Sequence, residues 1–142
     1  MTDIIIPTAA EVQERLLKGP YHQWLGLEVL SVGKGEIKLQ ARFRDEWVVN
    51  VAGGYIHGGI LAALVDLTAD WALVAFTGKG VPTLDLRVDY HRPARGDLTA
   101  VGSVIKTGKQ FSSAEARVFD SEGRLVASGR GLYATPAPTA SA

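Results

Sequence analysis

The chain has 142 residues, of which 46% are apolar and 21% charged, and its 15 basic residues balance its 15 acidic ones. This length suits one domain with a sizeable core, and the balanced charge gives no indication of a nucleic-acid or membrane partner. The sequence has no cysteine, which excludes disulfides and thiolate nucleophiles, and its three histidines are too widely spaced for a zinc cluster. No signal peptide or membrane-spanning run is apparent, so we expect a soluble, cytoplasmic protein.

The first third of the chain predicts a short helix followed by a hairpin. Residues 8–18 are amphipathic, with Thr8 as the N-cap, and Gly19-Pro20 ends them. From Leu25 to Phe43 apolar and polar residues alternate on either side of the turn Gly33-Lys34-Gly35. Alternation of this kind is typical of two antiparallel strands.

The middle of the chain predicts a loop and then the longest helix. The loop runs from Trp47 to Gly59, and the helix runs from Gly59 to about Phe76, with Gly78 and Gly80 as its end. This helix is apolar around most of its circumference, so it needs to be enclosed by other elements.

The last third reads as strands. Alternating residues and turn signals predict strands over 84–91, 98–106, 111–119 and 124–133, which we expect to form an antiparallel meander. The order of the elements predicts an α+β domain over residues 1–134, with one sheet curled around the central helix. Residues 135–142 contain only Pro, Ala, Thr and Ser, and we expect them to be a disordered tail.

The start of the long helix carries the chemistry. His57-Gly58-Gly59 lies where the first N–H groups of a helix lack partners, and glycine lets a ligand approach those donors closely. Asp66 follows within an apolar run, where an ionised carboxylate is costly unless it is paired or used. Amide donors and a carboxylate are what an acyl-transfer site requires.

The helical spacing bears on assembly. Eight residues at about 1.5 Å separate Gly58 from Asp66 by roughly 12 Å, too far for both to act on one carbonyl group. The distance closes if two copies of the helix run antiparallel about a two-fold axis. We therefore expect a dimer with shared sites, and two dimers would make a tetramer.

The chain resembles the hotdog-fold acyl-CoA thioesterases of the 4-hydroxybenzoyl-CoA thioesterase-like superfamily, in particular the PaaI-type branch of the phenylacetate pathway. The residues that carry the resemblance occur in the family's order: the turn at 57–59 followed by Asp66, then 82–90, 92–97, 108–109 and 123–127. The resemblance implies a hotdog fold, a dimeric or tetrameric assembly, and hydrolysis of an acyl-CoA thioester.

The resemblance also implies roles for individual residues. Asp66 matches the family's nucleophile or general base, and the Gly58 N–H matches the donor to the thioester oxygen. Asn50 is the candidate for holding substrate or water, although it lies one residue further from His57 than in the family's pattern. Thr83 matches a hydroxyl residue that positions water.

Further candidates surround these positions. Asp70, one turn after Asp66, could raise the pKa of Asp66 or hold water. Candidates for substrate contact are Gly59, Tyr55, Trp47 and, for the coenzyme A phosphates, Arg92, Arg95 and Lys109. No cofactor is expected beyond the coenzyme A of the substrate.

Two other functions stay open at this point. A hotdog enoyl-CoA hydratase or dehydratase would use an Asp/His pair, which His57 and Asp66 could form across a dimer. A non-catalytic module that binds or senses acyl-CoA would need no catalytic group.

Overall fold

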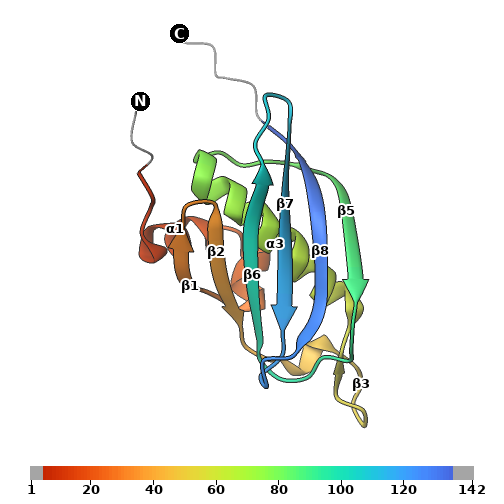
Figure 1. The fold of residues 1–142 in the computed structure, drawn as a ribbon. Helices are drawn as coiled ribbons and strands as arrows, with labels where there is room; N and C mark the ends of the chain where they lie inside the picture. Colours follow the sequence, from red (N-terminus) through yellow and green to blue (C-terminus); the bar gives the residue numbers. More distant parts are fainter. Residues whose placement is uncertain (1–4, 136–142) are drawn as a thin grey trace.

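The computed structural model describes residues 5–135 and shows one long helix, α3 (Gly58–Thr77), lying across one face of a six-stranded antiparallel sheet (Figure 1). The strands are β1 (Leu27–Gly33), β2 (Glu36–Ala41), β5 (Thr83–Tyr90), β6 (Leu98–Lys106), β7 (Phe111–Phe119) and β8 (Leu125–Ala134). Their spatial order is β1-β2-β6-β7-β8-β5. The prediction of an α+β domain with a sheet around one central helix, the hotdog fold, is confirmed.

Helix α3 forms the centre of the core. It packs against β2, β5, β6, β7 and β8, and nine of its residues are buried. Its C-terminus is capped by Gly78 in the left-handed conformation, as the sequence predicts. By length and composition alone α3 could cross a membrane, but here it is the core helix that the sheet wraps.

One glycine lets α3 approach the sheet closely. A Cβ atom at Gly102 on β6 would lie 2.4 Å from the carbonyl oxygen of Thr68 on α3. No side chain fits in that space, so glycine at this position allows the contact between helix and sheet.

The N-terminal region has one helix more than predicted. Helix α1 (Ala9–Leu16) has the expected capping box between Thr8 and Glu11. Gly19-Pro20 ends α1 as predicted, but Pro20 also begins a second helix, α2 (Pro20–Leu25). In the first turn of a helix the missing N–H of proline costs nothing. The hairpin β1–β2 follows as expected.

The predicted meander is correct for β6, β7 and β8 and wrong for β5. Strand β5 pairs with β8 at the edge of the sheet, and β6 pairs with β2. The reason is the length of the β5–β6 connection, which is too long for a tight hairpin: the N–H of His91 donates to the carbonyl of Val126, so the chain passes the start of β8 before entering β6.

Two other segments differ from expectation. A 3-10 turn, η1 (Asp45–Trp47), leads into the predicted loop before α3, and the loop itself contains a small ladder of β3 (Val48–Asn50) with β4 (Tyr55–Ile56). Thr135, predicted to lie in the tail, donates its N–H to the carbonyl of Gln110 over 2.8 Å. The rest of the predicted tail, residues 136–142, lies outside the described residues.

Candidate active site

The N-terminus of α3 presents a donor, as the glycine turn predicts. His57 is the N-cap, and its Nδ1 accepts the N–H of Gly59 over 2.7 Å, which makes this ring nitrogen an unprotonated acceptor. The N–H of Gly58 has no protein acceptor within residues 5–135. Gly58, and not Gly59, is therefore the amide that is open to a ligand.

Tyr90 supports this turn from β5. Its hydroxyl donates to the carbonyl of Gly58 over 2.9 Å, and a Cβ atom at Gly58 would lie 3.3 Å from its ring. The contact fixes the peptide at the start of α3 and leaves little room for a side chain.

Two turns along α3, Asp66 is held by two hydroxyl groups. Thr83 on β5 donates to Oδ1 of Asp66 over 2.9 Å, and Tyr133 on β8 lies 3.2 Å from the same atom. The Tyr133 hydroxyl also lies 3.0 Å from the main-chain oxygen of Asp66. Within the described part of the chain no Lys, Arg or His forms an ion pair with Asp66.

Asp70 lies one turn further and carries the perturbed carboxyl. Burial, together with the charge of Asp66, raises the pKa of Asp70 from 3.8 to about 7. Its Oδ1 is buried and has no hydrogen-bond partner among residues 5–135. The Asp70 carboxyl, with its pKa of about 7, is therefore partly protonated at neutral pH.

The structure separates Gly58 from Asp66 in the single chain. Both lie in α3, which is helical throughout this stretch, so eight residues put them roughly 12 Å apart along the axis. Asp66 is half-buried, and the donor and the carboxylate do not meet within one chain.

Asn50 is engaged in its own loop. Its Oδ1 accepts the N–H groups of Ala52 and Gly53 over 3.0 and 3.4 Å, an arrangement typical of an Asx turn. The oxygen that would polarise a substrate or water is used here to shape the loop before α3.

Tyr55 and Arg95 form part of the same loop structure. The Arg95 guanidinium lies 4.3 Å from the centre of the Tyr55 ring, and its Nε donates to the carbonyl of Gly53. Trp47, by contrast, is completely buried in the core, so in the single chain it has no surface with which to line an acyl pocket.

The three candidate phosphate contacts do not gather at one place. Arg92 and Arg95 lie in the connection between β5 and β6, whereas Lys109 lies in the turn between β6 and β7. Because β6 runs for nine residues between these two connections, they are separated by about 30 Å at opposite ends of the strand (Figure 1).

Tyr133 is the site residue that sequence reasoning missed. The sequence pattern places it only at the end of a strand, yet its hydroxyl reaches Asp66. The signal was the alternation along β8, which places Gly129, Gly131 and Tyr133 on the same face, the one toward α3.

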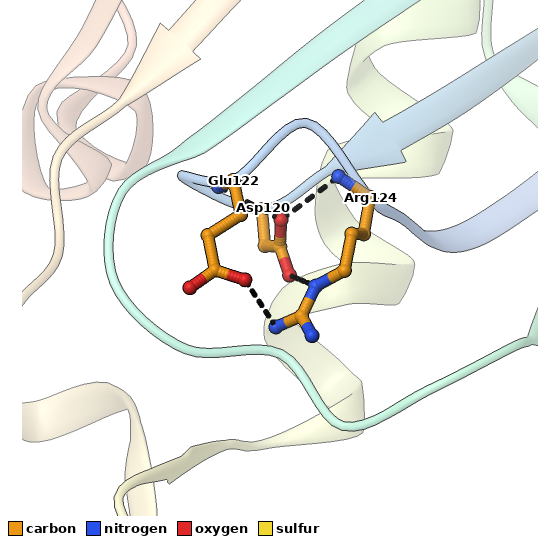
Figure 2. Close-up of polar contacts among 3 residues, drawn as sticks. All are labelled: Asp120, Glu122 and Arg124. Atoms are coloured by element: carbon orange, nitrogen blue, oxygen red, sulfur yellow. Dashed lines mark hydrogen bonds and ion pairs between the residues drawn. The ribbon is translucent and has the colours of Figure 1, made fainter.

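A second carboxylate cluster lies in the turn between β7 and β8 (Figure 2). The buried Asp120 accepts the N–H groups of Glu122 and Arg124 at Oδ1, and the Arg124 Nε lies 2.9 Å from Oδ2. Burial alone would raise the pKa of Asp120, but the hydrogen bonds from Arg124 and Glu122 outweigh it and lower that pKa. This cluster ties a turn together and leaves no oxygen of Asp120 free. Within residues 5–135 no group of three or more His, Cys, Asp or Glu side chains gathers in a way that could hold a metal ion.

The chain matches known proteins over the region that holds α3. The family model described as "Thioesterase superfamily" matches residues 53–127, which include Gly58, Asp66 and Thr83. An X-ray structure of a protein from the thioesterase superfamily is 44% identical, with a TM-score of 0.87 and coverage of 90% of this chain and 98% of that one.

Two further matches have more specific names. The medium/long-chain acyl-CoA thioesterase YigI of Escherichia coli strain K12 is 28% identical over an alignment of 130 positions, and the match covers 80% of this chain and 84% of YigI. A mutant structure of the phenylacetic acid degradation protein PaaI from Thermus thermophilus is 26% identical, with a TM-score of 0.73 and coverage of 83% of this chain and 100% of that chain.

Proposed function

Because the chain belongs to the thioesterase superfamily, we propose that it is an acyl-CoA thioesterase, which hydrolyses an acyl-CoA to the free acid and coenzyme A. The observation that carries the proposal is the Asp66 carboxylate on α3, which is held by two hydroxyl groups and paired with no cation in the described part of the chain. A carboxylate that is oriented but not neutralised is suited to accept a proton or to attack a carbonyl carbon.

The reaction requires a nucleophile and a donor for the carbonyl oxygen. In one route Asp66 removes a proton from water, the hydroxide attacks the thioester carbon, and the C–S bond breaks so that coenzyme A leaves as the thiolate, to which Asp66 can return the proton. In the other, Asp66 attacks directly, coenzyme A leaves as the thiolate, and water hydrolyses the resulting anhydride. In both routes negative charge develops on the carbonyl oxygen, where the Gly58 N–H would contribute about 3 to 4 kcal/mol by analogy with other oxyanion holes.

We propose that each site is shared between two chains. The separation of Gly58 from Asp66 along α3 supports this, because a partner helix running antiparallel would bring its Gly58 turn opposite Asp66. A homodimer is the smallest assembly that does so, and a tetramer of two such dimers is compatible with it.

Two substitutions test the shared site. Gly58→Pro removes the N–H donor and adds a Cβ about 3.3 Å from the Tyr90 ring, but it leaves the backbone in place, because proline is well accepted at the first position of a helix and the backbone of His57 is already extended, with ψ at 135°. Gly58→Ala adds a similar Cβ and keeps the N–H, so it is the matched control. We expect Gly58→Pro to lower kcat about 100-fold or more relative to Gly58→Ala.

Mixing inactive chains then locates the two halves of the site. A heterodimer of a Gly58→Pro chain with an Asp66→Asn chain would contain one doubly damaged site and one intact site. We therefore expect activity to reappear in the mixture, up to about half per heterodimer. A stable heterodimer that stays inactive would mean that both groups act within one chain.

The acyl group is proposed as aryl or medium-chain. YigI is named for medium- and long-chain acyl-CoA, and PaaI for phenylacetic acid degradation. The test is the release of free thiol from a panel containing phenylacetyl-CoA and alkyl-CoAs of increasing length. Turnover of one class that collapses in Asp66→Asn, while binding of that substrate persists, would support the proposal and identify the class.

The same panel separates the alternatives. A hydratase would change the absorbance of an enoyl-CoA without releasing thiol, and a sensor would bind acyl-CoA with no turnover. His57 is less suited to a hydratase here, since its Nδ1 already accepts the Gly59 N–H. No thiol release from any substrate would overturn the thioesterase proposal.

We propose that Arg92, Arg95 and Lys109 contact coenzyme A. Because Lys109 lies about 30 Å from the two arginines in one chain, it would act at the site of another chain of the assembly. Charge reversal at Arg95 or Lys109 should raise KM for acyl-CoA and leave kcat largely unchanged, as expected for a group that binds substrate and transition state equally. We further propose that the reaction needs no cofactor and takes place in the cytoplasm.

A further inference from the structure

The environment of Asp66 contains a buried tyrosine whose position depends on a neighbouring glycine. Tyr133 has no exposed surface, and its side chain folds back along β8 over Gly131. A Cβ atom at Gly131 would lie 2.2 Å from the Tyr133 hydroxyl. The path of Tyr133 to α3 therefore requires glycine at position 131.

The hydroxyl of Tyr133 lies within hydrogen-bond distance of two oxygen atoms of Asp66. It lies 3.0 Å from the main-chain oxygen of Asp66 and 3.2 Å from Oδ1. A phenol has one proton, so it is shared between the two acceptors. The contact links the carboxylate to the helix backbone that carries it, and so restricts rotation of the Asp66 side chain.

The second hydroxyl lies on the same oxygen. Thr83 donates to Oδ1, whereas Oδ2 of Asp66 has no hydrogen-bond partner among residues 5–135. The two oxygens are thus unequal: Oδ1 is held by the protein, and Oδ2 is free for water or a thioester.

We propose that Tyr133 is a positioning residue that fixes Oδ1 of Asp66, so that Oδ2 faces the reacting group. The proposal rests on the proposed function, since it assigns Asp66 the reactive role. Tyr133 lies beyond residues 53–127, the segment that the family model matches, so this role does not follow from the match. Burial, and then the charge of Asp66, raises the pKa of Tyr133, which keeps the phenol protonated as a donor.

The first test compares Tyr133→Phe with the wild type in thiol release. Phenylalanine keeps the ring and removes the donor, so we expect kcat to fall about 10- to 100-fold with KM nearly unchanged. A hydrogen bond to a carboxylate favours its ionised form, so its loss should also move the acidic limb of the kcat/KM profile to higher pH. Asp70, the other titratable group beside Asp66, is the same in both proteins. Tyr21→Phe, at an exposed tyrosine that stacks on Trp24, is the matched control.

A second variant covers the case in which Tyr133→Phe does not fold. 3-Fluorotyrosine at position 133 keeps the hydroxyl and nearly the same volume but is a stronger donor. It should move the acidic limb to lower pH, opposite to phenylalanine, which a purely structural role would not do.

The outcomes separate the two proposals. If the wild type releases no thiol from any acyl-CoA, the proposed function fails. If the wild type is active and 3-fluorotyrosine leaves kcat and the pH profile unchanged, the role of Tyr133 is overturned. A folded Tyr133→Phe protein with unchanged kcat and pH profile would overturn it equally.

Discussion

Two aspartates of this protein, Asp66 and Asp120, are both held by hydrogen bonds but differ in what surrounds them. Asp120 accepts two backbone N–H groups and the Arg124 guanidinium, so that both of its oxygens are used (Figure 2). Asp66 receives two neutral hydroxyls on one oxygen, has no cationic partner in the described chain, and has a second carboxyl, Asp70, one turn away.

The difference separates a carboxylate that ties a turn together from the one for which we propose a reactive role. A carboxylate that is fully paired is stabilised in its charged form and has nothing left to offer a substrate. One that is oriented by neutral donors keeps a free oxygen and an unpaired charge, and that charge, after burial of Asp70 itself, helps to raise the pKa of Asp70. Accordingly, the same substitution should have opposite consequences at the two positions.

The largest expected effect separates activity from stability. Asp66→Asn should lower kcat by more than about 1000-fold, because the amide is neither a base nor a nucleophile. Its free energy of unfolding should stay equal or increase, since an uncompensated charge is removed. Asp120→Asn should leave kcat per folded molecule unchanged. Thiol release and urea unfolding of both variants check this, and loss of kcat in Asp120→Asn would contradict the distinction.

The next effect is a pH dependence of stability that comes from Asp70. Because its pKa rises from 3.8 in the unfolded chain to about 7 in the folded one, the folded state binds the extra proton between these values. Stability is therefore highest below about pH 4 for this group and falls as the pH rises to about 7, by about 2 to 4 kcal/mol. Asp70→Asn should remove this fall, which urea unfolding of the wild type and the variant at several pH values would measure. If the free energy of unfolding of both proteins falls equally with pH, the prediction is wrong.

Asp120 should show the opposite pH dependence with a smaller magnitude. Its folded-state pKa is lowered, so its contribution is complete above about pH 4 and is lost as the pH falls through the folded value. Asp120→Asn weakens the bonds to Arg124 and should destabilise the fold by about 1 to 3 kcal/mol at neutral pH. The acid side of the urea-unfolding profile of the variant should then be flatter than that of the wild type.

The main strands, the central helix and the importance of Asp66 can be predicted from the sequence. The strong periodicity of residues 98–106 and 111–119 predicts β6 and β7 with their observed bounds, and the apolar run predicts α3 within one residue at each end. Asp66 stands out because a carboxylate within an apolar run has a cost that requires an explanation. These features are local, so they can be read from neighbouring residues.

The features that sequence reasoning misses depend on contacts between distant segments. Asp66 and Tyr133 are 67 residues apart, and although the alternation along β8 places Tyr133 on the face toward α3, it does not predict which residue of α3 the hydroxyl meets. The edge position of β5 follows from a connection that passes the start of β8, which periodicity does not encode. The resemblance makes Asn50 a candidate for holding substrate or water, and the structure adds a local contact that the resemblance does not predict: its Oδ1 accepts the amides two and three residues later.

The smallest expected effect concerns the hydroxyls that distinguish Asp66 from Asp120. Thr83→Val removes one donor to Oδ1 and should lower kcat about 10-fold, because one hydrogen bond to a charged group is worth about 1.5 kcal/mol or more. Thr77→Val is the matched control, since that hydroxyl donates to main-chain carbonyls at the end of α3, chiefly that of Leu73. If the two variants lose kcat equally, orientation of Asp66 by neutral donors does not contribute to turnover. If only Thr83→Val lowers kcat, and lowers it more at low pH, the reactivity of the free oxygen, Oδ2 of Asp66, depends on the hydrogen bonds that hold Oδ1.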